Sequence, residues 1–247
     1  MNIKNSTIIQ KKYSNLIETA TQFRQDYMGA RPFPNIVFEN FFEPNFLKSV
    51  LGEFPDLSQH NAKQFENAFE KKWAGNGEAL FGENTKSLMN YLNSEPFLRF
   101  LQELTGIQET LIGDPYYIGG GQHEIKRGGL LKVHVDFNKH PLLGLDRRLN
   151  VLIYLNEDWQ ESFGGHFELW NKSMKQCEKK ILPSFNKLAI FSTTDISYHG
   201  HPDPLMCPED RSRKSLALYY YTNGRPKGEF RNASGQNTTI FKQRKNQ

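Results

Sequence analysis

The sequence predicts a mixed α+β fold, in which a mostly helical N-terminal region supports a β-rich region built as a sandwich, jelly roll or barrel. Two observations lead to this prediction. Before Gly106, apolar residues recur at steps of three and four, which places them on one face of a helix. After Gly106, short runs rich in β-branched and aromatic residues are separated by Gly, Asn, Asp and Pro, a pattern typical of many short strands joined by turns.

Length and charge narrow the classes of protein that fit this chain. Its 247 residues suit one large domain, or one domain with an appended helical segment, and can bury a substantial core. The formal net charge is only +4, and Lys and Arg are scattered except for the run from Lys242 to Lys245, so we expect no nucleic-acid partner. We expect a monomer or a homodimer.

Cysteine usage and the lack of long apolar stretches indicate a cytoplasmic protein. Cys177 and Cys207 form no C-x-x-C pair, so neither a zinc ribbon nor a disulfide framework is predicted, and free thiols fit a reducing compartment. No apolar run begins the chain, and none approaches the roughly 20 residues that span a bilayer. We therefore expect neither a signal peptide nor a membrane segment. The sequons at Asn5, Asn232 and Asn237 are interpreted as chance matches.

Helical periodicity and proline positions divide the N-terminal region. An amphipathic helix is predicted over about residues 5–27, and the prolines at 32 and 34 end it. A strand is predicted over 35–41. Pro44 suits the first position of the next helix, which Pro55 stops. Further helices are predicted over 65–73, 86–92 and 96–104.

The region after Gly106 is predicted to hold the strands of the β-rich core. These strands are expected at 116–118, 122–126, 130–137, 149–155, 166–170, 187–193, 198–201 and 214–222.

The same patterns suggest three parts of one compact domain. Residues 1–106 form the mostly helical support, and residues 107–227 form the β core. Residues 228–247 are a polar, basic C-terminal tail, expected to be extended or disordered.

The run Leu130–Phe137 carries a candidate metal site. Its apolar residues alternate, so His134 and Asp136 share the opposite face of the predicted strand. An imidazole and a carboxylate on one strand face can bind the same divalent metal ion. With one distant histidine they make the ligand set of a mononuclear iron facial triad, which leaves positions open for oxygen and a co-substrate. Taken alone, the pair also fits an ordinary solvated strand face.

The segment His199-Gly200-His201-Pro202 supplies the distant histidine. It follows a strand-like apolar run that could return the chain to the first metal strand. Both histidines lie on the same side if the segment is extended. Because Pro202 favours a bend just after His201, we predict that His199 is the third ligand, with His201 as the alternative.

Two further strands carry residues suited to binding a carboxylate. Arg213 and Ser215 share one face of a strand, and the planar guanidinium of an arginine can hold both oxygens of a carboxylate. Tyr154 lies on another predicted strand, and its phenol could donate to the same carboxylate. The alternatives are a surface salt bridge for Arg213 and a packed core position for Tyr154.

Other polar residues are candidates for lesser roles. Gly164-Gly165 predicts a tight turn into the next strand, on which His166 and Glu168 share a face. We expect no second metal site there, because nothing nearby supplies a third ligand, although both residues could face the cavity. Candidate substrate contacts flank the first metal strand, namely His123, Glu124, Lys126, Asn138 and His140.

On these residues, the segment from Leu131 to Asn223 resembles the iron(II)- and 2-oxoglutarate-dependent oxygenases, specifically their prolyl-hydroxylase-like branch. His134-Val135-Asp136 is similar to the family's His-x-Asp motif, and His199 matches the distal histidine. The run Arg148–Trp159 with the following glycine pair is similar to the family's strand and turn. Arg213-Lys214-Ser215 looks like the Arg-x-Ser that some members carry, and the stretch from Pro34 to Pro55 is similar to the helical lead-in of bacterial members. Arg211, His140 and His201 have no assigned counterpart.

This resemblance implies a double-stranded β-helix, a cupin-like jelly roll, with an N-terminal helical support. His134, Asp136 and His199 would hold Fe(II), and 2-oxoglutarate would bind the metal with its far carboxylate on Arg213, helped by Tyr154 and Ser215. The implied enzyme is a dioxygenase that uses O2 to hydroxylate an unactivated C–H bond, while 2-oxoglutarate becomes succinate and CO2. The substrate would be a protein, peptide, amino acid or other small molecule, and ascorbate is a candidate reductant.

Two other functions fit parts of the pattern. A non-catalytic jelly-roll module that binds a sugar or a peptide would share the architecture, but it has no need for Arg213 and Tyr154 beside the metal residues. A zinc-dependent hydrolase could use the same three ligands, because zinc lowers the pKa of a bound water. It would not need Arg213.

Overall fold

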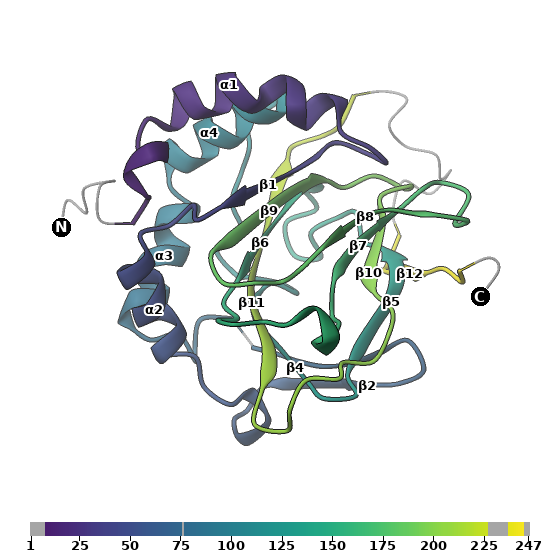
Figure 1. Ribbon diagram of the computed structural model, residues 1–247. Helices are drawn as coiled ribbons and strands as arrows, with labels where there is room; N and C mark the ends of the chain where they lie inside the picture. The colour runs from purple at the N-terminus through teal and green to yellow at the C-terminus, as the bar shows by residue number, and fades with distance from the viewer. Residues whose placement is uncertain (1–7, 76, 227–236, 245–247) are drawn as a thin grey trace.

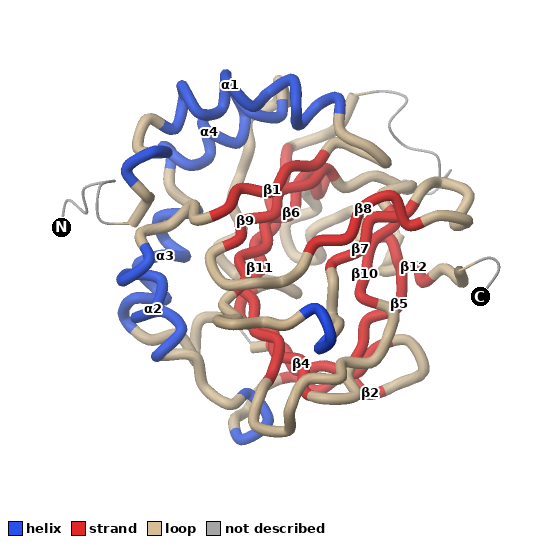
Figure 2. Tube along the Cα trace, viewed as in Figure 1, coloured by secondary structure: helices blue, strands red, loops and turns tan. Residues whose placement is uncertain are grey.

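The computed structural model describes residues 8–75, 77–226 and 237–244 (Figure 1). Helices lie along one side and one end of a curled sheet, and the strands fill the rest of the molecule (Figure 2). The mixed α+β class predicted from the sequence is confirmed.

The α-helices begin and end at recognisable capping residues. The first, α1 (Leu16–Gly29), starts later than predicted because the Asn15 side chain caps it by accepting a hydrogen bond from the Glu18 amide at 3.3 Å. The last, α4 (Glu95–Thr105), ends at Gly106, whose φ of 72° is the left-handed conformation that glycine adopts readily. None of the helices in the described ranges is long and apolar enough to cross a membrane. The other two are α2 (Pro44–Gly52) and α3 (Glu83–Leu92), and short 3-10 turns occupy Lys11–Tyr13, Leu57–Gln59 and Glu161–Phe163.

All the paired strands run antiparallel within one curled sheet. Their order is β1-β9-β6-β11-β4-β3-β5-β10-β7-β8, with β12 added beside β5 and β2 beside β3. The strands are β1 (Asn35–Glu39), β2 (Lys63–Glu66), β3 (Glu70–Ala74), β4 (Gly121–Lys126), β5 (Leu130–Val135), β6 (Asp146–Tyr154), β7 (Phe167–Trp170), β8 (Cys177–Ile181), β9 (Lys187–Ser192), β10 (Tyr198–His201), β11 (Ser212–Thr222) and β12 (Ile240–Phe241).

The two faces of the sheet have different surroundings. On one face, alternate residues of β6, β9 and β11 join the main apolar core with side chains from all four α-helices. On β11, Leu216, Leu218 and Tyr220 belong to this helix-packed face. Arg213 and Ser215 point the other way, into a cavity enclosed by the curl of the sheet. As the alternation in the sequence predicted, successive residues of β11 face the helix-packed core and the cavity in turn.

The prediction of a short helix over 65–73 is wrong, because this segment forms the β2–β3 hairpin. Phe65, Phe69 and Trp73 recur at four-residue steps, as on a helix. The Asn67 carboxamide instead accepts hydrogen bonds from the amides of Phe69 and Glu70 at 2.8 and 3.1 Å and forms a turn. Pairing of β3 with β4 and β5 then outweighs the local helical pattern.

Three other segments differ from the sequence-based expectation. Residues 116–118 form turns, because the Asp114 carboxylate accepts hydrogen bonds from the amides of Tyr116 and Ile118 at 2.8 and 2.7 Å. The charged strand β8 was not predicted. Within the tail, residues 237–244 dock on β5 through β12. The predicted start of the first helix, the sequons at Asn5 and Asn232 and most of the tail lie outside the described residues.

Candidate active site

His134, Asp136 and His199 meet at the centre of the cavity. Antiparallel pairing of β5 and β10 sets His199 directly opposite His134, and their ring centroids are 4.5 Å apart. Asp136 follows β5 on the same face as His134. One potential ligand atom from each of the three residues lies within 4.8 Å of the other two. Among the described residues, this is the one such cluster of His, Cys, Asp and Glu found.

Backbone carbonyls set the tautomer of both histidines. Nδ1 of His134 lies 2.9 Å from the Lys132 carbonyl oxygen, and Nδ1 of His199 lies 2.8 Å from that of Ser197. A carbonyl oxygen can only accept, so each Nδ1 carries the proton and donates it. Nε2 is therefore the ring atom of each histidine that can bind a metal ion, and it lies 3.5 Å (His134) and 3.3 Å (His199) from a carboxylate oxygen of Asp136.

A buried network holds Asp136 in place and ionised. Asn150 Nδ2 donates to Asp136 Oδ2 at 2.8 Å, while Nε and Nη2 of Arg147 donate to Asn150 Oδ1 at 2.9 and 2.7 Å. Burial alone would raise the pKa of the Asp136 carboxyl, but the Arg147 guanidinium holds this pKa well below its usual range. The carboxylate is therefore available as a charged ligand.

His199 is neutral at physiological pH. Burial lowers its pKa to about 4, against the opposing effect of the Asp136 carboxylate, which favours the protonated ring. Two imidazole Nε2 atoms and one carboxylate on a single face fit a divalent metal such as Fe(II), because this donor set leaves other coordination positions open.

Gly200 explains how β10 comes so close to β5. A Cβ atom at this position would lie 2.8 Å from the Leu131 carbonyl oxygen and 2.9 Å from that of Lys132. Glycine is therefore required for His199 to face His134. His201, on the other side of Gly200, lines the same cavity but lies outside the cluster of three.

Arg213 lies on the cavity wall and is only 5% exposed. Its Nε donates to the Gly165 carbonyl oxygen at 2.9 Å, and its Nη2 donates to the Tyr154 hydroxyl at 3.4 Å. A Cβ atom on Gly165, whose φ is 70°, would lie 3.0 Å from Arg213 Cδ. The predicted glycine pair thus makes both the turn and the space for the arginine. Among the described residues, no carboxylate forms an ion pair with Arg213.

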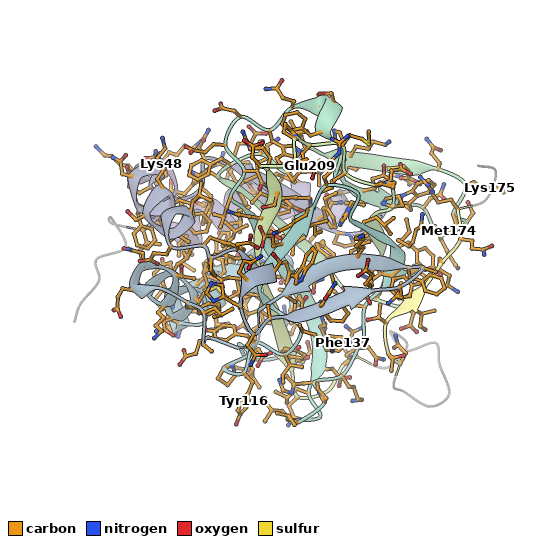
Figure 3. All side chains as sticks on the ribbon, turned by 90° about the horizontal axis from the view of Figure 1, so that it is seen from below. Lys48, Tyr116, Phe137, Met174, Lys175 and Glu209 are labelled. Atoms are coloured by element: carbon orange, nitrogen blue, oxygen red, sulfur yellow. The ribbon has the colours of Figure 1, made fainter. Side chains whose placement is uncertain are left out.

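The cavity that joins the metal cluster to Arg213 has a volume of about 470 Å³. Ser215 lines it beside Arg213, whereas Tyr154 is fully buried and reaches the site through its hydroxyl on the guanidinium. The β2–β3 hairpin contributes Phe65 and Lys72 to the rim. The hairpin crosses the molecule when it is seen from below (Figure 3).

Comparisons with known proteins agree with this geometry. A family model described as "2OG-Fe(II) oxygenase superfamily" matches residues 121–221, the segment that contains all three clustered residues and Arg213. Over residues 121–221 this chain is therefore similar to the 2OG-Fe(II) oxygenase superfamily. The intact His-Asp-His triad of the chain supports a non-haem iron dioxygenase, and the family match and the triad together imply Fe(II) and 2-oxoglutarate.

Relatives of this oxygenase include prolyl hydroxylases. Mouse prolyl 3-hydroxylase OGFOD1 is 32% identical over 79 residues, which are 30% of this chain and 14% of the relative, so the match spans a small part of that protein. A Pseudomonas putida prolyl-4-hydroxylase aligns with a TM-score of 0.60 and 15% identity over 85% of this chain and 100% of its own.

A third relative comes from Trichoplax adhaerens. This prolyl hydroxylase, in complex with a hypoxia inducible factor peptide fragment, aligns with a TM-score of 0.60 and 18% identity over 86% of this chain and 94% of its own. These structural likenesses confirm the predicted double-stranded β-helix fold.

The second histidine–carboxylate pair of this oxygenase does not form a metal site. Glu168 accepts a hydrogen bond from Trp170 Nε1 at 2.9 Å and pairs with Lys180 at 3.0 Å. His166 instead pairs with Glu161 at 2.6 Å. The two side chains therefore have separate local partners.

Of the five candidate substrate contacts, His123 is the one that lines the cavity. Glu124 accepts hydrogen bonds from the Leu57 amide and the Ser212 hydroxyl, at 2.7 and 2.6 Å. Lys126 pairs with Asp56 at 2.7 Å. His140 Nε2 lies 3.2 Å from Asp114, and Asn138 accepts from the Asn237 amide at 2.8 Å.

Arg147 is the site residue that sequence reasoning missed. It is fully buried between the rings of Phe137 and Tyr219, 4.4 and 3.4 Å from their centroids, and Nη2 lies 3.3 Å from Asp136 Oδ2. No local pattern distinguishes it from the adjacent Arg148. Its role comes from a neighbouring strand brought beside Asp136 by the curl of the sheet.

Proposed function

We propose that this oxygenase hydroxylates an unactivated C–H bond of a protein or peptide residue and converts 2-oxoglutarate to succinate and CO2. In this proposal His134, Asp136 and His199 hold Fe(II), and Arg213, Tyr154 and Ser215 bind the far carboxylate of 2-oxoglutarate. The observation that carries the proposal is the buried Arg213 guanidinium in the same cavity as the triad.

A buried guanidinium without a carboxylate partner is costly, because its charge loses hydration without a compensating ion pair. The hydrogen bonds of Arg213 to Gly165 and Tyr154 aim the group but do not neutralise it. A dianionic co-substrate supplies the missing charge at this end of the cavity, and its 2-oxo acid supplies oxygen ligands at the triad. This arrangement suits 2-oxoglutarate and has no purpose in a zinc-dependent hydrolase.

His201 gives independent support for a polar ligand in the cavity. Its side chain is buried, and neither ring nitrogen has a hydrogen-bond partner among the described residues. Buried polar groups of this kind are normally satisfied, at a cost of about 1–3 kcal/mol when they are not. Since His201 and Arg213 line one cavity, a bound carboxylate could accept a hydrogen bond from the His201 ring.

Residues around the triad orient the three metal ligands. Bound Fe(II) with 2-oxoglutarate supplies the oxidising chemistry by activating O2. Asn150 and Arg147 keep the Asp136 carboxylate oriented, and the carbonyls of Lys132 and Ser197 hold the ring proton of each histidine on Nδ1, so that Nε2 is the ring atom available to a metal ion. The low exposure of these groups limits access of water to the site.

An anaerobic titration tests the co-substrate assignment. Fe(II) and then 2-oxoglutarate are added to the apoprotein, and the weak visible charge-transfer band of the chelate is recorded. We expect the band in the wild type, and in Arg213→Met we expect about 10- to 100-fold weaker 2-oxoglutarate affinity, because charge-assisted hydrogen bonds are lost.

Arg211 offers a matched control, because it lies two residues from Arg213 but donates instead to the Glu157 carbonyl oxygen. Arg211→Met should bind 2-oxoglutarate like the wild type. Absence of the band in a protein that binds Fe(II), or equal loss in both variants, would count against the proposal.

Support for a peptide substrate comes from the relatives. The mouse relative is named a prolyl 3-hydroxylase, and the Trichoplax structure contains a peptide. The test is succinate formation, with gain of one oxygen atom by the substrate, in the presence of candidate peptides and of free amino acids. Turnover of free amino acids alone would overturn the peptide assignment.

A further inference from the structure

The C-terminal segment, residues 237–244, lies along the edge of β5 that carries the metal residues. Its strand β12 pairs antiparallel with β5, with Ile240 opposite Val135 and Phe241 opposite His134. The Lys242 amide donates to the Val133 carbonyl oxygen at 2.8 Å. β12 lies beside β5 at the end of the chain, and from below it is seen next to the β2–β3 hairpin (Figures 1 and 3).

The register of this pairing directs alternate residues of the segment toward the metal site. Phe241 faces the same way as His134, and their ring centroids are 5.6 Å apart. Continuing the register by two residues sets Thr239 opposite Asp136, and Thr239 lines the catalytic cavity. The Asn237 side chain donates to the Asp136 carbonyl oxygen at 3.1 Å. An extended peptide in this position therefore presents alternate side chains, at the Thr239 and Phe241 positions, to the metal residues.

The strand pairing of the segment is short and partly exposed. Strand β12 contains only two residues, and Ile240 is 36% exposed. Phe241 stacks on Phe69 in the hairpin turn, with centroids 4.8 Å apart, and Phe69 is itself 47% exposed. Outside the strand, Arg244 pairs with Asp203 at 2.7 Å, and Asn237 exchanges hydrogen bonds with Asn138. A short strand with exposed contacts is easily exchanged for another chain, since strand addition uses backbone hydrogen bonds that any sequence can make.

We propose that the edge of β5 from Val133 to Asn138 is the docking site for the substrate, an extended peptide that adds as an antiparallel strand in place of residues 237–242. The residue to be oxidised takes the position of Thr239. An aromatic or large apolar residue two positions later takes the place of Phe241 between Phe69 and His134. This inference rests on the proposed function, and it specifies an extended protein segment as the substrate class.

The chain's own segment acts as the stand-in for that peptide. While docked, it competes with substrate as a strand of the same chain, and such intramolecular binding acts at a high effective concentration. Substrate binding should therefore strengthen when the contacts of the segment are removed. A free amino acid would not need this edge and would not respond to such changes.

The experiment uses the full-length, metal-free protein and a labelled peptide with the sequence of residues 237–244. Fluorescence anisotropy reports binding to the wild type, to Phe241→Ala and to Lys242→Pro, which lacks the amide that donates to Val133. Both variants should bind the peptide at least about tenfold more tightly than the wild type, because the tethered competitor is weakened. Two independent variants guard against misfolding of either one.

Two controls match the register. Ile240→Ala changes a neighbouring apolar residue whose side chain points away from the metal residues, and it should bind the peptide far more like the wild type than Phe241→Ala does. A peptide that is N-methylated at the Lys242 position cannot donate to Val133 and should not bind. Equal binding of all the protein variants, or of the methylated peptide, would overturn the docking site.

A second measurement places the peptide relative to the metal site. Mn(II) is added to Phe241→Ala, and NMR line broadening is measured along the bound peptide. Broadening should be greatest at the Thr239 position and smallest at the Arg244 position; any other order refutes the register. Neither measurement requires 2-oxoglutarate. Failure of the docking proposal is therefore distinguishable from failure of the proposed function, which the anaerobic titration tests.

Discussion

The two faces of the curled sheet differ in how completely the protein satisfies their side chains. On the helix-packed face, Leu216 and Leu218 are buried among apolar neighbours, and the Tyr220 hydroxyl donates to the Leu92 carbonyl oxygen at 2.9 Å. On the cavity face, His201 has no hydrogen-bond partner and Arg213 has no carboxylate partner among the described residues. The packed face is complete once the chain folds, whereas the cavity face is completed by ligands.

This contrast assigns stability and binding to opposite faces of the same strands. Apolar burial on the packed face contributes favourably to folding. Buried polar groups without partners on the cavity face oppose folding until a ligand supplies the missing contacts. Substitutions on the packed face should therefore lower the free energy of unfolding and leave ligand affinity unchanged, whereas substitutions on the cavity face should lower ligand affinity.

The largest effect is expected from losing a metal ligand on the cavity face. His199→Ala should lower the affinity for Fe(II) or Mn(II) at least about 100-fold, because even residues that only support a metal ligand are worth 10- to 100-fold. His201→Ala should keep an affinity close to that of the wild type. Anaerobic calorimetric titration measures both, and comparable loss in His201→Ala would mean that His201 is a ligand.

On the packed face, a cavity-forming substitution should act on stability alone. Leu216 is fully buried, so Leu216→Ala should lower the free energy of unfolding by about 2–5 kcal/mol. Urea denaturation measures this loss. The 2-oxoglutarate affinity of the folded fraction should not change, and a parallel loss of affinity would show that the two faces are coupled.

Arg213→Met should show the reverse pattern. Removing a buried charge that lacks an ionic partner should raise the free energy of unfolding of the ligand-free protein by about 1 kcal/mol or more. The wild type should gain thermal stability from Mn(II) with 2-oxoglutarate over Mn(II) alone, and the variant should not. Destabilisation of the ligand-free variant would indicate that Arg213 is a packing residue.

The smallest effect concerns acid sensitivity of the cavity face. Burial, together with the nearby Lys72 ammonium, lowers the pKa of His123 to about 3. In the unfolded chain His123 takes up a proton near its ordinary pKa of about 6.5. Between about pH 6.5 and pH 3 the unfolded state therefore binds more protons than the folded state. The free energy of unfolding falls as the pH drops through this range. His123→Gln should lose less stability than the wild type between pH 7 and pH 5, as measured by urea denaturation at each pH. Identical losses would contradict this assignment.

Local patterns in the sequence account for the chemistry on each single strand. Side chains alternate along a strand, so the shared face of His134 and Asp136, and that of Arg213 and Ser215, followed from their spacing. The turn at Gly164-Gly165 was equally local, because glycine readily adopts the positive φ that both positions have. Helix periods and proline positions likewise indicated the four α-helices.

Contacts between strands could not be read from such patterns, because they depend on register between segments far apart in the chain. The position of Pro202 favoured His199 over His201, but the pairing of β5 with β10 is what brings His199 to Asp136, and the curl of the sheet places Arg147 beside the same carboxylate. Long-range pairing also placed residues 65–73, which have a helical pattern in the sequence, in a hairpin at the cavity rim. The pairing of β12 with β5 beside His134 could not be predicted from the sequence either, because backbone hydrogen bonds along a strand edge can be made by almost any residue type.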